Sequence, residues 1–109
     1  MNNVILTGYI TKDIELRYTK DQNAVCNFTL AVARETQRDN ADFPRISVFG
    51  KTAENLCKFC GKSSRIAVIG KLRTSTYEDA QGETQKITEV LADRIEFLSR
   101  KEETQDDEY

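Results

Sequence analysis

The amino-acid sequence predicts an all-β fold, a five-stranded OB-fold barrel with one helix between its third and fourth strands. Five segments alternate in polarity with the two-residue period of a β-strand, and a sixth has apolar residues at helical spacing. Their order along the chain is strand, strand, strand, helix, strand, strand, which is the order of the OB-fold. This fold hosts several kinds of binding site, so the fold alone does not determine the function.

Residues 3–11 and 25–34 are predicted to form the first two strands. The first strand carries Val4, Leu6, Gly8 and Ile10 on one face and Ile5, Thr7, Tyr9 and Thr11 on the other, with apolar groups on both faces near its start. The predicted core side of the second strand carries Cys26, Phe28, Leu30 and Val32. Between the strands, residues 14–18 are a short extension and residues 19–24 a polar turn. Residues 35–42 contain a single apolar residue and are predicted to be a polar loop.

Residues 43–51 are predicted to form the third strand, with Pro44 near its start because proline lacks the N–H that a strand interior needs. Ile46 and Val48 face the core. The other side carries Phe43, Arg45, Ser47, Phe49 and Lys51. A helix follows over residues 52–60, with Thr52 as its N-cap. Its apolar positions are Ala53, Leu56, Cys57 and Cys60, and Gly61 with Ser63 and Ser64 marks its end.

The fourth and fifth strands are predicted over residues 65–77 and 84–98, joined by a turn at 79–82. In the fourth strand, the core side carries Ile66, Val68, Gly70 and Leu72, and the other side includes Lys71, Arg73 and Tyr77. These limits predict one domain over residues 1–98, followed by a short acidic disordered tail over residues 99–109.

The formal charge of the chain is −2, and its distribution matters more than its sum. The five acidic residues of 102–109 leave 16 basic and 13 acidic residues in 1–101, a charge of +3. A weakly basic body with a separate acidic end is compatible with binding to nucleic acid, although many proteins with this bias bind none.

The composition excludes several classes of function. The chain has no histidine, which removes the commonest general base and zinc ligand. No nucleotide-binding loop or nucleophile elbow is present, so we expect neither an enzyme nor a bound cofactor. We see no signal peptide and no apolar stretch long enough to cross a membrane, so we expect a cytoplasmic, nucleoid-associated protein that contacts no membrane.

The non-core sides of the third and fourth strands combine cations with aromatic rings. A cation neutralises phosphate, and a ring stacks on a base, which together are the chemistry of binding to single-stranded nucleic acid. The alternative is that the rings are buried between copies of the chain in an assembly subunit and that the cations only keep the protein soluble.

Several short motifs resemble the bacterial single-stranded DNA-binding protein family. They are Asn3-Val4-Ile5-Leu6-Thr7-Gly8, Leu16-Arg17-Tyr18, Phe28-Thr29-Leu30-Ala31-Val32, Val48-Phe49-Gly50-Lys51 with Ala53-Glu54, Gly70-Lys71-Leu72-Arg73-Thr74, and Thr88-Glu89-Val90. The resemblance implies an OB-fold that binds and protects single-stranded DNA during replication, recombination or repair. It also implies a homotetramer, with a homodimer as the alternative.

The resemblance implies roles for particular residues. The DNA-stacking positions are Phe43, Phe49 and Tyr77, and the basic positions along the DNA path are Arg17, Arg45, Lys51, Lys62, Lys71 and Arg73. Arg34, which lies beside the polar loop, is a further predicted DNA-binding residue. This chain departs from the family in having no tryptophan, a polar Thr36 at an often aromatic position, and Ser63 where glycine is common. Its acidic tail lacks the usual apolar tip, so the tail is either a solvated end or a contact for replication or repair proteins.

Cys57 and Cys60 form a C-x-x-C pair. A redox pair of this kind normally lies at a helix N-terminus, and this pair is predicted at the other end. A zinc site needs four ligands, and the chain has no second pair. We therefore predict that these cysteines, and Cys26, are core residues and that no metal is bound. A dithiol redox protein is the alternative.

Overall fold

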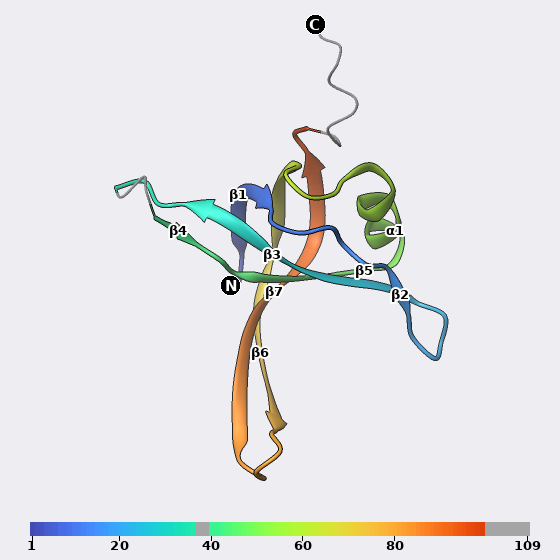
Figure 1. Ribbon diagram of the computed structural model, residues 1–109, viewed down its shortest axis with the longest axis vertical. Helices are drawn as coiled ribbons and strands as arrows, with labels where there is room; N and C mark the ends of the chain where they lie inside the picture. Colours follow the sequence, from blue (N-terminus) through green and yellow to red (C-terminus); the bar gives the residue numbers. More distant parts are fainter. Residues whose placement is uncertain (37–39, 100–109) are drawn as a thin grey trace, which may run out of the picture.

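The computed structural model describes residues 1–36 and 40–99, and the predicted acidic tail lies outside them apart from Ser99. The strands are β1 (Val4–Ile10), β2 (Arg17–Tyr18), β3 (Ala24–Ala33), β4 (Ala41–Asp42), β5 (Arg45–Phe49), β6 (Arg65–Glu78) and β7 (Thr84–Phe97), and the helix is α1 (Gly50–Phe59). Figure 1 shows the strands crossing one another, with α1 packed at one side. No helix in the described residues is long and apolar enough to span a membrane.

Five long strands close into a ring. The pairing order is β1, β6, β7, β5 and β3, and β3 returns to β1 through Tyr9 opposite Ala31 and Ile10 opposite Leu30. All the neighbours are antiparallel except β5 and β7, which pair in parallel. The helix lies in sequence between β5 and β6, the third and fourth of these strands. The predicted OB-fold is therefore confirmed.

The predicted alternation produces the core. Its largest fully buried side chains are Ile10, Leu30, Ile46, Leu56 and Ile66, with Val48, Val68 and Cys26 beside them. Burying one such aliphatic side chain is worth about 1.5–3 kcal/mol. Cys60 is also buried and Cys57 packs partly against the core, so the three cysteines lie where the sequence predicts them.

The helix begins two residues earlier than predicted. Phe49 is the N-cap and makes no side-chain capping bond, so the prediction of Thr52 as N-cap is wrong. Gly50 has φ of +70°, a conformation that glycine adopts without steric cost, and this lets β5 pass directly into α1. Lys51 therefore lies in the first helical turn and not on the strand. The helix ends at Phe59, and its C-cap is Cys60, whose N–H donates to the Leu56 carbonyl over 2.9 Å.

The third strand is shorter than predicted. It begins at Arg45, after Pro44, whose carbonyl accepts a hydrogen bond from the Leu30 N–H over 3.1 Å. Phe43 is therefore outside the strand. The predicted polar loop before it contains β4, which pairs with β3 through Val32 opposite Asp42 and Ala33 opposite Ala41. Of the predicted extension over 14–18, only Arg17 and Tyr18 pair, with the start of β3.

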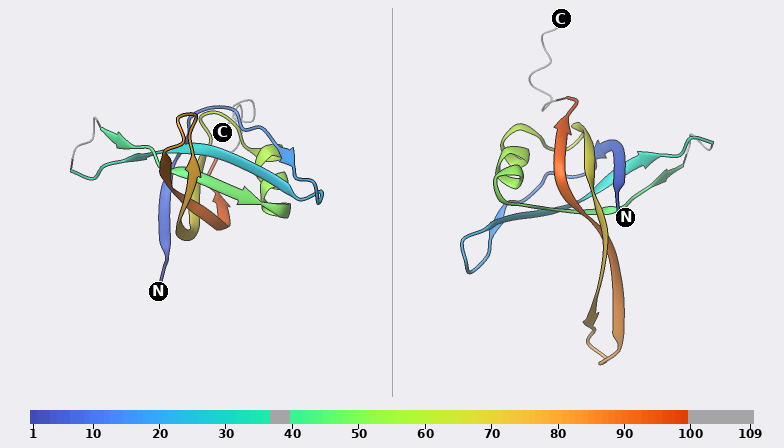
Figure 2. Two further views of the ribbon diagram at one scale, coloured as in Figure 1. Left: turned by 90° about the horizontal axis from the view of Figure 1, so that it is seen from below. Right: turned by 180° about the vertical axis from the view of Figure 1, so that it is seen from behind.

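The outer halves of β6 and β7 form a hairpin that projects from the barrel, which we call the arm (residues 71–88). Figures 1 and 2 show the arm extending alone, with no third strand beside it. Leu72 lies at its base and is 48% exposed, so the prediction that Leu72 faces the core is wrong. The Leu72 side chain lies on the same side of β6 as the buried Ile66 and Val68, but it is beyond the end of the barrel core.

A register shift marks the base of the arm. Ile69 lies opposite Arg94 and Gly70 opposite Ala92, so β7 has one extra residue at this point. The strands approach closely here, because a Cβ atom on Gly70 would lie 2.1 Å from the Leu91 carbonyl oxygen. Asn2 also binds here, since its side-chain amide exchanges two hydrogen bonds of 2.8 Å with the backbone of Leu72.

Asp79 organises the turn at the tip of the arm. Its carboxylate accepts hydrogen bonds from the backbone N–H groups of Gln81 and Glu83 and from the Gln85 side chain. Hydrogen bonding from the Glu83 N–H, followed by that from Gln85, lowers the pKa of Asp79 below its ordinary value. The turn is therefore specified by one aspartate, together with Gly82 at φ of +81°.

Candidate nucleic-acid interface

The strand register places most of the predicted binding residues on one outer face. Residues directly opposite one another in a sheet share a face. Arg17, Val25 and Phe49 form one row across β2, β3 and β5. A second row runs through Asn27, Ser47, Leu91 and Lys71. The remaining pairs are Thr29 with Arg45, Arg73 with Glu89, and Tyr77 with Gln85. We call this surface the outer face.

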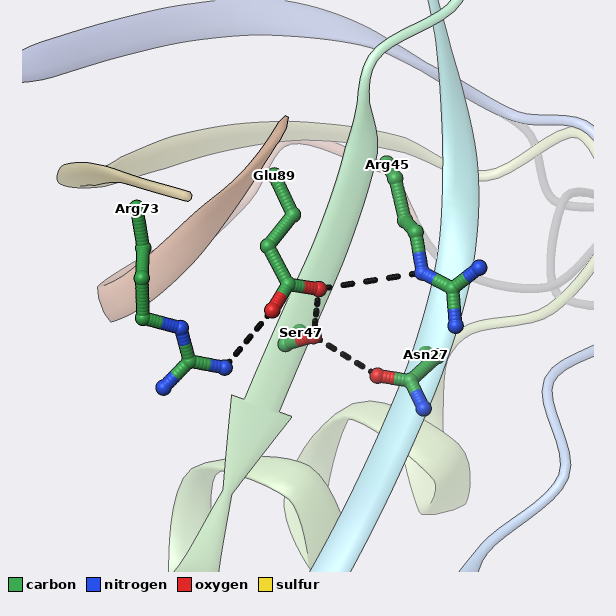
Figure 3. A network of polar contacts seen from close by, with 5 residues as sticks. All are labelled: Asn27, Arg45, Ser47, Arg73 and Glu89. Atoms are coloured by element: carbon green, nitrogen blue, oxygen red, sulfur yellow. Dashed lines mark hydrogen bonds and ion pairs between the residues drawn. The ribbon is translucent and has the colours of Figure 1, made fainter. Parts of the chain in front are cut away.

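Glu89 lies at the centre of the outer face and binds two arginines from different strands (Figure 3). Its Oε2 accepts a hydrogen bond of 2.7 Å from Arg73 Nη2, and its Oε1 lies 3.7 Å from Arg45 Nε. Ser47 Oγ is also 2.7 Å from Oε1. The Glu89 residue is only 9% exposed, whereas the two arginine side chains are about half exposed.

Ser47 joins Glu89 to Asn27. Its Oγ lies 2.7 Å from Asn27 Oδ1 as well as 2.7 Å from Glu89 Oε1. A serine hydroxyl has one hydrogen and can donate to only one of these oxygens. The charged carboxylate is the stronger acceptor, so we expect the Asn27 amide to present its NH₂ group to Ser47 instead. Ser47 lies on the non-core side, as predicted, and it is nevertheless buried because this network covers it.

The network keeps Glu89 ionised. Burial alone would raise the pKa of Glu89, but hydrogen bonds from Arg73 and Ser47, together with the charges of Arg73 and Arg45, outweigh burial. The pKa therefore lies below its ordinary value. Two positive charges and one negative charge are concentrated here, and the cluster carries a net charge of +1.

The other predicted cations have different surroundings. Arg34 pairs with Asp42 at 2.9 Å, and Lys71 lies 3.9 Å from Asp93, all at exposed positions where such pairs contribute little stability. Arg17, Lys51 and Lys62 are exposed, and no acidic side chain among the described residues forms an ion pair with them. Lys51 lies in the first turn of α1 and Lys62 lies three residues beyond the end of the helix, so neither belongs to a strand row of the outer face.

The aromatic side chains divide into two groups. Phe49 and Tyr77 lie on the outer face and are 43% and 50% exposed. Phe43 is 62% exposed and lines an apolar groove at the mouth of the barrel with Val4, Leu6, Val32, Leu72 and Val90. Leu72 and Val90 alternate with Arg73 and Glu89, so the groove is on the other side of the sheet. The structure therefore does not bring Phe43 together with Phe49.

Sequence reasoning missed Glu89 and Asn27. Glu89 stands within a quoted motif, yet no role was assigned to it. The predicted turn at 79–82 contained a usable signal, because pairing outward from the turn sets Tyr77 opposite Gln85 and Arg73 opposite Glu89. Asn27 could not be found in this way, since its contact depends on the pairing of β3 with β5.

The thiols lie apart from the outer face. Burial, followed by the neighbouring Cys57, raises the pKa of Cys26 to about 12, so this thiol is protonated at neutral pH.

Tyr18, beside Arg17, donates a hydrogen bond to Glu54 Oε2 over 3.2 Å, and this bond raises the pKa of the Tyr18 hydroxyl. Over residues 1–36 and 40–99, no group of three or more potential metal ligands is found.

Comparison with known proteins shows which family has this barrel. Residues 1–98, which include every strand and the helix, match the single-strand binding protein family. The chain belongs to the single-strand binding protein family. The resemblance inferred from the short motifs is therefore confirmed.

Three similar proteins come from streptococci. The chain is 41% identical over 108 residues to single-stranded DNA-binding protein 1 of Streptococcus pyogenes serotype M18, covering 95% of this chain and 83% of that protein. It is 44% identical over 102 residues to the single-stranded DNA-binding protein of S. pyogenes serotype M3, and 41% identical to that of Streptococcus mutans. Those alignments cover 90% of this chain but only 63% and 62% of the two relatives.

Proposed function

We propose that this chain binds and protects single-stranded DNA with little sequence preference and catalyses no reaction. The observation that carries the proposal is the outer face, on which arginines and exposed rings from β2, β5 and β6 form one surface. Membership in the single-strand binding protein family, and the names of its relatives, support the same function.

The proposed mechanism combines stacking with charge neutralisation. Phe49 and Tyr77 stack on bases, which is worth about 1–3 kcal/mol per base and tolerates any base because each has a π-face. Arg45 and Arg73 contact phosphates through the guanidinium nitrogens that do not face Glu89. Arg17, Arg34, Lys51, Lys62 and Lys71 extend the positive surface, and Phe43 offers a ring at the barrel mouth.

We propose further that the chain assembles into a homotetramer, with a homodimer as the alternative. The outward side of β1 supports this, because Ile5 is 71% exposed and Tyr9 52% exposed on a strand inside the sheet. Light scattering of the purified protein tests the assembly. The competing proposal, that the outer-face rings are buried between copies, predicts that Tyr77 is shielded from quenchers before any DNA is added.

The decisive experiment is a titration of fluorescently labelled dT oligomers of several lengths at two salt concentrations. We expect binding that weakens as salt increases, since phosphate neutralisation releases counterions. Phe49→Ala should weaken binding by about 1–3 kcal/mol, the value of one stacked base. Phe59→Ala is the matched control, because Phe59 is similarly exposed but packs against Phe97 away from the outer face. Absence of salt-sensitive binding at micromolar protein would contradict the proposal.

The cellular role follows from this activity. A coat on single-stranded DNA serves replication, recombination or repair, and we propose a cytoplasmic, nucleoid-associated location. Contacts of the acidic tail with replication or repair proteins are a separate proposal. Removing residues 102–109 and measuring partner capture tests it without altering the barrel.

A further inference from the structure

Glu89 is an unexpected residue at the centre of a surface that we propose binds a polyanion. Among the described residues it is the only buried acidic side chain. It lies between two arginines that would otherwise offer two full charges to phosphate. A carboxylate at this position opposes DNA binding electrostatically, so its presence calls for a physical explanation.

The geometry leaves the arginines accessible while Glu89 stays bound to them. Each guanidinium carries five N–H donors, and Glu89 engages a single nitrogen of each. Figure 3 shows the two terminal nitrogens of Arg45 pointing away from Glu89. A phosphate can therefore approach both arginines from the solvent side without removing the carboxylate.

Displacement of Glu89 by phosphate is unfavourable. If DNA replaced Glu89 on the arginines, the carboxylate would remain buried without its charge partners, which is costly. Glu89 also accepts a hydrogen bond from the Ser47 hydroxyl between the parallel strands β5 and β7, where few residues pair. The carboxylate is therefore expected to remain in place beneath bound DNA.

We propose that Glu89 is an internal counter-charge that positions Arg45 and Arg73 and limits the positive charge that they offer to single-stranded DNA. Arg45, Arg73 and Glu89 together then offer a net charge of +1 to DNA. The inference rests on the proposed function, and it concerns how tightly the outer face binds DNA and how easily it releases DNA. It assigns to Glu89 a role that weakens binding.

The test is Glu89→Gln, which keeps the shape and one acceptor oxygen, replaces the other oxygen with an NH₂ group and removes the charge. For single strands, each additional neutralised phosphate steepens the salt dependence of log K by about 0.7. We expect a slope steeper by about this amount and affinity about fivefold higher at low salt, the effect of one unit charge at close range in water. Glu89→Asp, which keeps the charge, should retain the wild-type slope.

Glu15→Gln is the matched control, because it removes one exposed carboxylate outside the barrel strands and should leave the slope unchanged. Thermal melts establish that each variant is folded. If Glu89→Gln does not fold, Glu89→Met removes the same charge and fills a similar volume. An unchanged slope, or weaker binding by the folded charge-removing variant, overturns the inference while wild-type binding upholds the proposed function. Loss of salt-sensitive binding in the wild type overturns both.

Discussion

The same two strands behave differently in their two halves. Within the barrel, β6 alternates buried and partly exposed residues, with Ile66 and Val68 fully buried. In the arm, every residue from Lys71 to Glu78 is exposed on both sides of the sheet. Side chains alternate between the two sides of the sheet in the barrel and in the arm alike. Only in the barrel do other strands cover one of these sides. Burial therefore depends on the neighbouring strands and not on the local sequence pattern.

This difference predicts that the barrel and the arm differ in local stability. The barrel half is held by a packed core, whereas the arm is held by cross-strand hydrogen bonds and by its turn. A two-stranded hairpin without further packing is marginally stable in water. The arm should therefore open locally far more often than the barrel.

The largest expected effect comes from Gly70→Ala at the boundary. The added Cβ would lie 2.1 Å from a backbone oxygen of β7, which cannot move without separating the strands. We expect the free energy of unfolding to fall by about 3 kcal/mol or more. Gly82→Ala at the tip is the control, because it meets no atom within 4 Å and strains only its own φ. Chemical denaturation of both variants measures the difference, and equal losses would contradict the comparison.

Removing the arm should separate folding from binding. We expect a variant in which Asn-Gly joins Thr74 to Thr88, an opposite pair in the present register, to keep the barrel and the Arg73–Glu89 bond. Loss of Tyr77 should weaken dT binding by about 1–3 kcal/mol. Tyr77→Ala in the complete chain is the control for the ring alone. Circular dichroism and anisotropy measure the two properties, and unfolding of the shortened chain would show that the arm supports the barrel.

Acid should destabilise the barrel partly through Glu89. The pKa of Glu89 in the folded protein lies below its ordinary value of 4.5. Its ionised form therefore stabilises the fold above about pH 4.5, and this contribution is lost as the pH falls through the folded-state pKa. Hydrogen bonds to charged groups contribute about 1.5–3 kcal/mol. Melts from pH 7 to pH 3 should show the Tm of the wild type approaching that of Glu89→Gln; a constant difference would contradict this account.

The smallest effect on global stability is expected from Asp79→Ala. The substitution removes three hydrogen bonds that hold the tip of the arm, all at solvent-exposed positions. We expect faster amide hydrogen exchange at Gln81 and Glu83, while the Tm of the barrel stays within about 2 °C. A large fall in Tm would show that the tip and the barrel unfold together.

Much of the fold could be predicted from the sequence because each barrel strand buries one side in the core and exposes more of the other. This produces an alternating pattern of apolar and polar residues. The periods in residues 25–34 and 65–70 identify core positions that the structure confirms. Leu72 was misplaced because alternation cannot reveal where the covering strands end. Thr52 was misplaced because Gly50, through its positive φ, allows the helix to start without a polar cap.

The candidate site was less accessible to sequence reasoning. Arg45, Phe49, Arg73 and Tyr77 could be placed on one face because each lies on a strand with clear alternation. Phe43 does not share their face, because β5 begins only after Pro44 and the alternation of β5 therefore does not extend to Phe43. Glu89 gained its importance from contacts with β5 and β6 together, and such contacts follow from closure of the barrel, which no single segment encodes.

The parallel contact between β5 and β7 has a consequence for how the protein is made. β7 leaves the ribosome after the other described strands, and it supplies the pairing partner of both β5 and β6. Until it arrives, β5 presents an unpaired edge to other nascent chains. Closure through contacts so distant in sequence also slows folding, to the millisecond-to-second range of other barrels. The strand that carries Glu89 therefore determines when the newly made chain is safe from aggregation.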